Sequence, residues 1–327
     1  MLKSKIKIFS HNDLDGIGSI VLLNVVNHTF RYDICLPDSV EQSTNPRQVG
    51  VKLKAFIENE EYEKYDKVFI TDLYINKETA EMIDKINYNN KFLLFDHHKH
   101  SLYLNDYEWA TVAVDIDGVL TCGTELFWKY LYEIEENIDI RSTRMLEACM
   151  RFVELIRLYD TWDWFNNPSV LSEDARQLNI LFKIDGYKKF KNKMVDRLLT
   201  KKTRFIDDVD KLIISCIDDM KKAYISQKVA DVKYIRYGGY KIGYVFADQY
   251  ISELGSAMLN NNELDINTAA IINAQTSTVS LRSIDPNVDV GKLAVEFSGG
   301  GHTNSSGFLY NSSLNNLLVE KIFNKEG

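Results

Sequence analysis

An Asp-His-His triplet, Asp96-His97-His98, directly follows the apolar run 92–95. A short apolar run bounded by Asn89 and Asn90 predicts a buried strand of a parallel sheet. In open α/β sheets, ligands bind beyond the carboxyl ends of the strands. One carboxylate and two imidazoles at such a place can hold a divalent metal ion. A single triplet is equally compatible with a solvated turn, so a metal site requires further ligands elsewhere in the chain.

Further acidic residues follow predicted strands or helices at three other places: Asp13 and Asp15 after segment 5–9, Asp72 after segment 67–71, and Asp160 after segment 145–158. Parallel strands bring their carboxyl ends to one edge of a sheet. Carboxylates gathered there repel one another unless cations lie between them. Mixed carboxylate and imidazole ligands favour Mn²⁺, with Mg²⁺, Co²⁺ or Fe²⁺ as alternatives. The set is large enough for two ions, which activate water against a phosphorus centre, and it predicts phosphoester hydrolysis.

A glycine run followed by histidine, Gly299-Gly300-Gly301-His302, stands near the C-terminus. Consecutive glycines let successive backbone N–H groups point at one anion. The hydroxyl of Ser305 or Ser306 and the guanidinium of Arg282 would add further donors. Most glycine runs are only turns, but the histidine and arginine nearby favour phosphate binding here.

Strands and helices are predicted to alternate through the first part of the chain. The predicted strands are 5–9, 30–36, 67–71 and 91–95, and the predicted helices are 17–26, 49–56, 77–86 with Asn76 as its cap, 124–132 and 145–158. Alternation of this kind predicts an α/β fold with a doubly wound, mostly parallel sheet. Such a sheet would place the acidic residues at one edge.

The amino-acid composition changes after residue 183. Segment 183–204 is rich in Lys and Arg and, with the helical stretch 206–229, suggests a connector. Its charges form either a solvated helix face or the lining of a nucleic-acid groove. Strands at 234–237, 240–246, 269–273 and 278–282, with a helix near 253–259, then predict a small α/β domain. We expect a catalytic domain over 1–185, a helical connector over 186–230 and a substrate-binding domain over 231–327.

Composition sets limits on the class of protein. The chain has 327 residues, a length that suits two domains. Its net charge of −8 argues against a protein that coats long nucleic acids. A short, highly charged substrate is still compatible with it. The four cysteines form no CxxC pair, which favours reduced thiols. We find no signal peptide and no stretch that could span a membrane, and expect a soluble, cytoplasmic protein.

As a set, these motifs resemble the DHH phosphoesterase superfamily. The matching segments are His11-Asn12-Asp13-Leu14-Asp15-Gly16, Thr71-Asp72, Phe95-Asp96-His97-His98 and Tyr159-Asp160-Thr161, with Ser280-Leu281-Arg282-Ser283 and 299–307 resembling its C-terminal substrate-binding domain. The resemblance implies two domains with a cleft between them and a centre of two Mn²⁺ ions.

The resemblance also implies roles for single residues. Its metal ligands would be Asp13, Asp15, Asp72, His97 and Asp160, with Asp72 bridging, and Asp72, Asp96 and His98 would act in catalysis. The substrate-binding residues would be Arg282, Ser283, Gly299, Gly300, Gly301, His302 and Ser305. His11 is a candidate ligand or a residue behind the ligands, because several family members have their histidine at the position of Phe9. Asp163 is an alternative to Asp160.

The stand-alone oligoribonuclease (nanoRNase) group is the most similar part of this superfamily. The expected function is hydrolysis of short oligonucleotides to mononucleotides. The alternatives are a phosphatase or phosphodiesterase acting on 3′-phosphoadenosine phosphate or on cyclic or linear dinucleotides, and an exonuclease for short single-stranded DNA. A nucleotide-binding module without activity would lack a ligand, and the central aspartates are all present. The expected partners are a short single-stranded oligonucleotide or a small nucleotide and a second copy of the chain, with no membrane. Trp162, Trp164 and Tyr74 either stack a base or form core and cleft wall.

Overall fold

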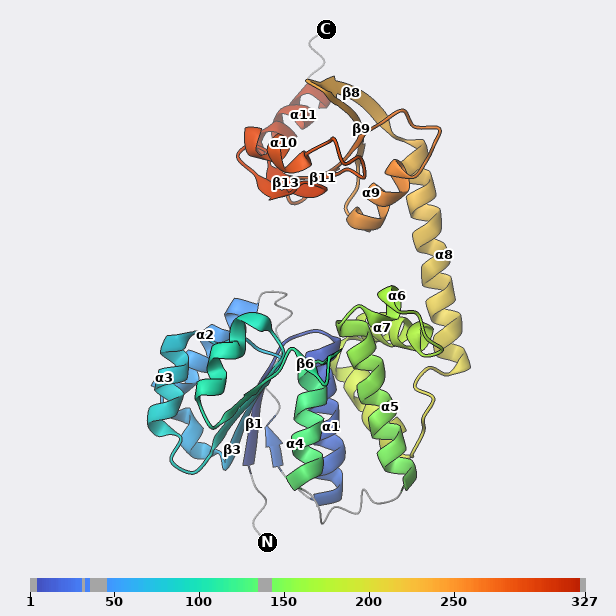
Figure 1. Cartoon of the computed structure of the whole chain (residues 1–327). Helices are drawn as coiled ribbons and strands as arrows, with labels where there is room; N and C mark the ends of the chain where they lie inside the picture. Colours follow the sequence, from blue (N-terminus) through green and yellow to red (C-terminus); the bar gives the residue numbers. More distant parts are fainter. Residues whose placement is uncertain (1–4, 31–32, 36–45, 135–142, 324–327) are drawn as a thin grey trace. The chain divides into compact units, whose positions relative to one another are not determined.

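The computed structural model describes residues 5–30, 33–35, 46–134 and 143–323 (Figure 1). Contacts within the chain group it into two compact units, Met1–Ile214 and Ser215–Gly327. Among the described residues, no helix has the length and apolar character needed to cross a membrane.

A five-stranded parallel sheet forms the centre of the first unit. Its strands are β1 (Lys5–Ser10), β2 (Asp33–Cys35), β3 (Lys67–Thr71), β4 (Phe92–Asp96) and β5 (Ala110–Val112). They lie in the order β2-β1-β3-β4-β5, which is a doubly wound arrangement whose connections reverse between β1 and β3. The predicted fold class is therefore confirmed, and the reversal marks the point where such sheets bind their ligands.

Helices cover both faces of this sheet (Figure 1). One face carries α1 (Leu14–Phe30) and α4 (Gly123–Ile134), and α5 (Thr143–Asp160) and α7 (Ser172–Leu199) pack against these helices in the same core. The other face carries α2 (Pro46–Glu58) and α3 (Lys77–Ile86). Side chains alternate along β1, because successive residues of a strand point to opposite faces. Ile6 and Ile8 belong to the core under α1. Phe9 packs on the other face against Phe56 of α2, with the two ring centroids 5.1 Å apart.

Local signals place several elements correctly. Asn76 caps α3 by accepting a hydrogen bond from the Thr79 amide at 2.9 Å, as predicted. Of the strand expected over 30–36, residues 33–35 form β2, residue 30 is instead the last residue of α1, and residues 31, 32 and 36 lie outside the described part. The sequence analysis did not predict β5 or several other elements of the first unit, namely η1 (Glu61–Lys64), η2 (Lys99–Asp106), β6 (Asp115–Ile116), β7 (Val119–Leu120) and α6 (Asp163–Asn166).

The basic stretch lies in α7 and in the start of α8 (Asp208–Ala230). Phe190 and Leu198 are fully buried in the core of the first unit. Lys193 and Arg197 form ion pairs with Asp210 at 2.9 and 2.6 Å. These two cations therefore stabilise the join between α7 and α8.

The second unit is a mixed six-stranded sheet with helices on both faces. Its strands are β8 (Lys233–Tyr237), β9 (Tyr240–Phe246), β10 (Thr268–Asn273), β11 (Thr278–Arg282), β12 (Gly300–His302) and β13 (Ser305–Leu309), in the order β12-β13-β11-β10-β9-β8. The end of α8 and α9 (Ile251–Leu259) pack on one face, and α10 (Val290–Glu296) packs on the other. The last helix is α11 (Ser313–Phe323).

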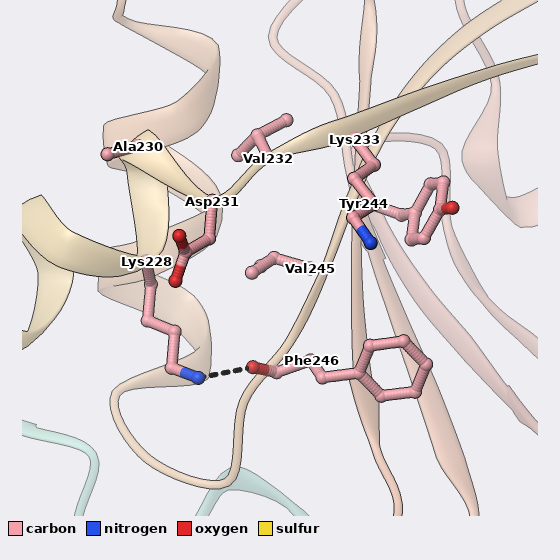
Figure 2. A pocket seen from close by; sticks show the side chains of 8 residues that line it. All are labelled: Lys228, Ala230, Asp231, Val232, Lys233, Tyr244, Val245 and Phe246. Carbon is pink, nitrogen blue, oxygen red and sulfur yellow. Dashed lines mark hydrogen bonds between the residues drawn. The ribbon is translucent and has the colours of Figure 1, made fainter. Parts of the chain in front are cut away.

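A pocket lies where α8 gives way to β8 (Figure 2). Its walls are Lys228, Ala230, Asp231, Val232, Lys233, Tyr244, Val245 and Phe246. The Lys228 ammonium donates a hydrogen bond to the Phe246 carbonyl at 2.8 Å. This contact fixes the end of α8 against β9.

Candidate functional site

Eight acidic and imidazole side chains meet at the carboxyl edge of the parallel sheet. They are His11, Asp13, Asp15, Asp72, Asp96, His97, His98 and Asp160. They form three groups, and within each group the potential ligand atoms all lie within 4.8 Å of one another. The groups are Asp72, Asp96, His97 and His98; His11, Asp13 and Asp72; and Asp15, His97 and Asp160. They come from the loop after β1, the start of α1, the ends of β3 and β4, and the end of α5. The structure thus brings together every residue that the sequence analysis named as a metal ligand.

Asp72 belongs to two of these groups. It is 3% exposed and has a left-handed backbone with φ of 50°, a conformation that is costly for a residue with a side chain. Its Oδ2 has no hydrogen-bond partner among the described residues. Burial, then the negative charges of Asp15 and Asp13, raise the pKa of Asp72 well above its ordinary value. A buried and unpaired carboxylate oxygen in this setting fits the coordination of a cation.

The imidazole of His97 lies between three carboxylates. Its Nε2 is 3.4 Å from Asp160 Oδ2, 3.5 Å from Asp72 Oδ1 and 3.7 Å from Asp15 Oδ2. Burial, followed by the charges of Asp15 and Asp13, raises the pKa of Asp160 to about 8. Oxygen and nitrogen donors in this mixture suit divalent ions such as Mn²⁺ or Mg²⁺, so the residues present fit a metal centre.

The start of α4 holds Asp15 in place. The amides of Gly123 and Thr124 donate to the two Asp15 carboxylate oxygens at 2.7 and 2.8 Å. A Cβ atom at Gly123 would come within 2.9 Å of Asp72 Cβ and 3.0 Å of its backbone N. The helix can approach this closely only because residue 123 is glycine. The sequence analysis did not identify these two residues, whose only signal is their position at the start of the helix predicted over 124–132.

Asp96 and His98 form a pair within the cluster. Asp96 Oδ1 accepts hydrogen bonds from the His97 amide at 2.9 Å and from His98 Nδ1 at 2.7 Å. The contact with Asp96 raises the pKa of His98, although burial partly offsets it. Burial alone would raise the pKa of Asp96, but the opposing effects, of which that of His98 is the largest, together outweigh it. The pKa of Asp96 therefore lies below its ordinary value. Both shifts favour the pairing of an imidazolium with a carboxylate.

The structure bears on two alternatives that the sequence left open. His11 Nδ1 lies 2.6 Å from Asp13 Oδ2 and 3.8 Å from Asp72 Oδ2, whereas Phe9 is a core residue. Asp163 forms an ion pair with Arg157 at 2.8 Å, and it is absent from the three groups. The geometry thus favours Asp160 over Asp163, and it places His11 beside Asp13 and Asp72, where it is either a ligand or a residue behind the ligands. Sequence reasoning missed Arg157, whose ion pair holds the Asp163 carboxylate.

Three of the predicted substrate-binding residues form a row across the second sheet. Arg282 of β11 pairs in register with Ser305 of β13, which pairs with His302 of β12. Residues directly opposite in antiparallel strands point to the same face. The Arg282 guanidinium donates to Ser252 Oγ at 3.2 Å, and Gly255 of α9 leaves room for its side chain.

Other residues of this group have contacts within the unit. The Ser283 hydroxyl is buried and donates to the Asn267 carbonyl at 2.8 Å. The Ser306 hydroxyl donates to the Val290 carbonyl, so Ser305 is the freer of the two serines. A Cβ atom at Gly299 or Gly301 would collide with the backbone of β13. Only Gly300 of the three glycines faces open space.

Comparison with known proteins decides the family. The model of the DHH family N-terminal domain matches residues 5–151. Oligoribonuclease NrnB of Bacillus subtilis (strain 168) is 32% identical over 319 residues, which cover 97% of this chain and 75% of that protein. The chain belongs to the DHH family. The resemblance inferred from the motifs is confirmed, and this DHH protein is a phosphoester hydrolase.

The similar solved structures include two of low sequence identity. The DHH domain of a protein from a family of ribosomal proteins has a TM-score of 0.50 at 12% identity, covering 97% of this chain and 85% of that one. RecJ of Thermus thermophilus, solved in complex with Mn²⁺, has a TM-score of 0.47 at 12% identity, covering 98% of this chain and 51% of that one.

Proposed function

We propose that this DHH protein is a metal-dependent phosphodiesterase that hydrolyses short oligonucleotides to mononucleotides. The observation that carries the proposal is the cluster of carboxylates and imidazoles around the buried Asp72 Oδ2, which has no hydrogen-bond partner among the described residues. The 32% identical relative named an oligoribonuclease supports this class of substrate. A homodimeric state and a cytoplasmic location stay predictions.

The proposed ligands of a pair of Mn²⁺ ions are His11, Asp13, Asp15, Asp72, His97 and Asp160. Asp72 would bridge, since its carboxylate belongs to two of the three groups. When bound, two such ions supply charge neutralisation at the phosphoryl oxygens and a water of lowered pKa. Mn²⁺ is preferred to Mg²⁺ because imidazole ligands are present.

His98, oriented by Asp96, is proposed to donate a proton to the leaving group. The Asp96 carboxylate accepts from His98 Nδ1, which orients the ring and leaves Nε2 available for a proton transfer. The contact with Asp96 raises the pKa of His98 and so favours its protonated form. From Nε2 it can protonate the departing ribose oxygen, as a general acid.

The second unit is proposed to bind the phosphate groups of the substrate. Arg282, Ser305 and His302 present a guanidinium, a hydroxyl and an imidazole on one face of the sheet. A guanidinium binds phosphate through two parallel hydrogen bonds. We retain a catalytic domain over 1–185, a connector over 186–230 and a substrate-binding domain over 231–327 as the proposed division of labour.

The experiment is hydrolysis of an end-labelled RNA series, from the dimer to about a dozen nucleotides, with Mn²⁺, Mg²⁺ or a chelator. Single-stranded DNA of matched length, a cyclic dinucleotide and 3′-phosphoadenosine phosphate are assayed alongside. Mononucleotide release from the shortest RNAs, strongest with Mn²⁺, is expected. Turnover of the small nucleotides alone would overturn the choice of substrate, and turnover in the chelator would overturn the metal centre.

A further inference from the structure

Four aromatic residues gather directly beside Asp160. They are Tyr159 at the end of α5, Trp162 in the following turn, and Trp164 and Phe165 in α6, which lies next to the end of α5 (Figure 1). The rings of Tyr159 and Trp164 are stacked with an interplanar angle of 9° and centroids 5.8 Å apart. Trp162 continues the stack on Trp164 at 27° and 6.1 Å. Three rings thus form one pile.

The pile has a buried end and an open end. Tyr159 and Trp164 pack against the hydrophobic core of the first unit. Trp162 is 60% exposed, and Phe165, whose ring meets that of Trp162 edge-on, is 64% exposed. Large aromatic surface left in water is unfavourable, and a contiguous patch of it marks a binding site more often than a single exposed residue does.

The turn that presents Trp162 is strained and firmly held. Trp162 has a φ of 62°, in the left-handed region that is costly for residues with a side chain. Its amide donates to the Tyr159 carbonyl, and its own carbonyl accepts from the Phe165 amide at 3.0 Å. The next residue, Asp163, is fixed by the buried Arg157. A strained conformation persists only where the surroundings determine it, and such positions concentrate at functional sites.

The stack lies next to the proposed metal centre. The Asp160 carboxylate is 3.4 Å from His97 Nε2, and its residue lies between Tyr159 and Trp162 in the chain. Two peptide units separate the Cα atoms of Asp160 and Trp162, which are thus at most about 7.6 Å apart. The backbone of Trp162 therefore lies close to that of a proposed metal ligand, at a separation that one nucleotide can span.

We propose that the Tyr159–Trp164–Trp162 pile is a stacking site for an unpaired nucleobase of the substrate. This inference rests on the proposed function and extends it from the phosphodiester to the base attached to it. Every base has a π-face, so stacking on an indole binds single strands with little dependence on sequence. A base within a duplex has both faces covered and cannot enter the pile.

The test compares an adenylate trinucleotide with a trimer of the same backbone that lacks its bases. In the wild type, KM for the adenylate trimer is expected to be lower. Trp162→Ala is expected to raise that KM by about 5- to 100-fold, to the value for the abasic trimer, with kcat little changed. Trp162→Phe keeps an aromatic face and is expected to restore most of the difference. Val170→Ala, which trims another exposed apolar residue, is the matched control.

Failure of the stacking site and failure of the proposed function give different results. Equal losses on both trimers would show that Trp162 has only a structural role, and no loss on either would show that it does not bind the substrate; both results would overturn the stacking site. If the wild type cleaves neither trimer, the proposed function is wrong. The stacking site is then decided by fluorescence, because adenosine monophosphate should quench tryptophan emission in the wild type and much less in Trp162→Phe. Equal quenching in the two proteins would overturn it.

Discussion

Gly123 lies directly against Asp72, so that a Cβ atom at residue 123 would come 2.9 Å from Asp72 Cβ and 3.0 Å from its backbone. The same glycine donates its amide to Asp15 at 2.7 Å. One residue at the start of α4 therefore sets the positions of two proposed metal ligands.

Gly123→Ala is expected to weaken metal binding by about 10- to 100-fold, the usual effect of disturbing a residue that orients ligands. The added methyl group meets backbone atoms, which cannot move aside as a flexible side chain can. Metal titration by calorimetry measures the effect. Gly50→Ala is the control, since residue 50 lies in α2 with open space around it. Equal affinities in the two variants would show that α4 does not position the ligands.

Asp72→Asn is expected to lower kcat by about a thousandfold or more, because it removes several kcal/mol of charge stabilisation at the reacting centre. The metal-free variant should nevertheless melt at a higher temperature than the metal-free wild type near pH 8. It lacks a buried charge that repels Asp15 and Asp13. Asp163→Asn should lower the melting temperature instead, since Asp163 is paired with Arg157. A lower melting temperature in Asp72→Asn would contradict the described electrostatics.

The metal-free protein is expected to lose stability as pH rises from about 4 to about 8. The pKa of Asp160 is about 8 in the folded protein and that of Asp72 is also raised, whereas both lie near 3.9 in the unfolded chain. The unfolded state therefore releases these protons first, and stability present at low pH is lost through the folded pKa. The loss is on the order of a few kcal/mol. Thermal melts in a chelator should show it, and Mn²⁺ should abolish it; a flat profile would argue against the raised values.

His98→Asn is expected to lower kcat by roughly 10²- to 10⁴-fold on oligonucleotides, the range for loss of a general acid. The loss should shrink sharply on a p-nitrophenyl phosphodiester, whose leaving group departs without a proton. Metal affinity should stay close to that of the wild type. An equal loss on both substrates together with weaker metal binding would make His98 a ligand.

Arg282→Ala is expected to raise KM by about tenfold to a hundredfold, since hydrogen bonds to charged groups contribute roughly 1.5–3 kcal/mol. Arg282→Lys should recover only part of this, because an ammonium cannot make the two parallel hydrogen bonds of a guanidinium. Arg236→Ala removes an exposed charge from β8 of the same sheet and is the control. Initial rates on short RNA give the KM of each variant. An unchanged KM in Arg282→Ala would count against phosphate binding by the row of Arg282, Ser305 and His302.

The first sheet and its cluster were predictable because their signals are local. Apolar runs such as 67–71 and 92–95 end in the residues that carry the chemistry, and a parallel sheet has to bring these ends together. The positions of Gly123 and Thr124 were not predictable, because their bonds to Asp15 span more than a hundred residues. The availability of Ser305 rather than Ser306 depends on strand register, which spacing alone does not fix.

The cluster belongs wholly to the first unit, and the row of Arg282, Ser305 and His302 belongs wholly to the second. Each set is positioned by the sheet and helices of its own unit. Substitutions that reshape the row therefore leave the bonds that orient Asp15 and Asp72 untouched. Substrate preference can change during evolution, or by design in the laboratory, without rebuilding the catalytic centre.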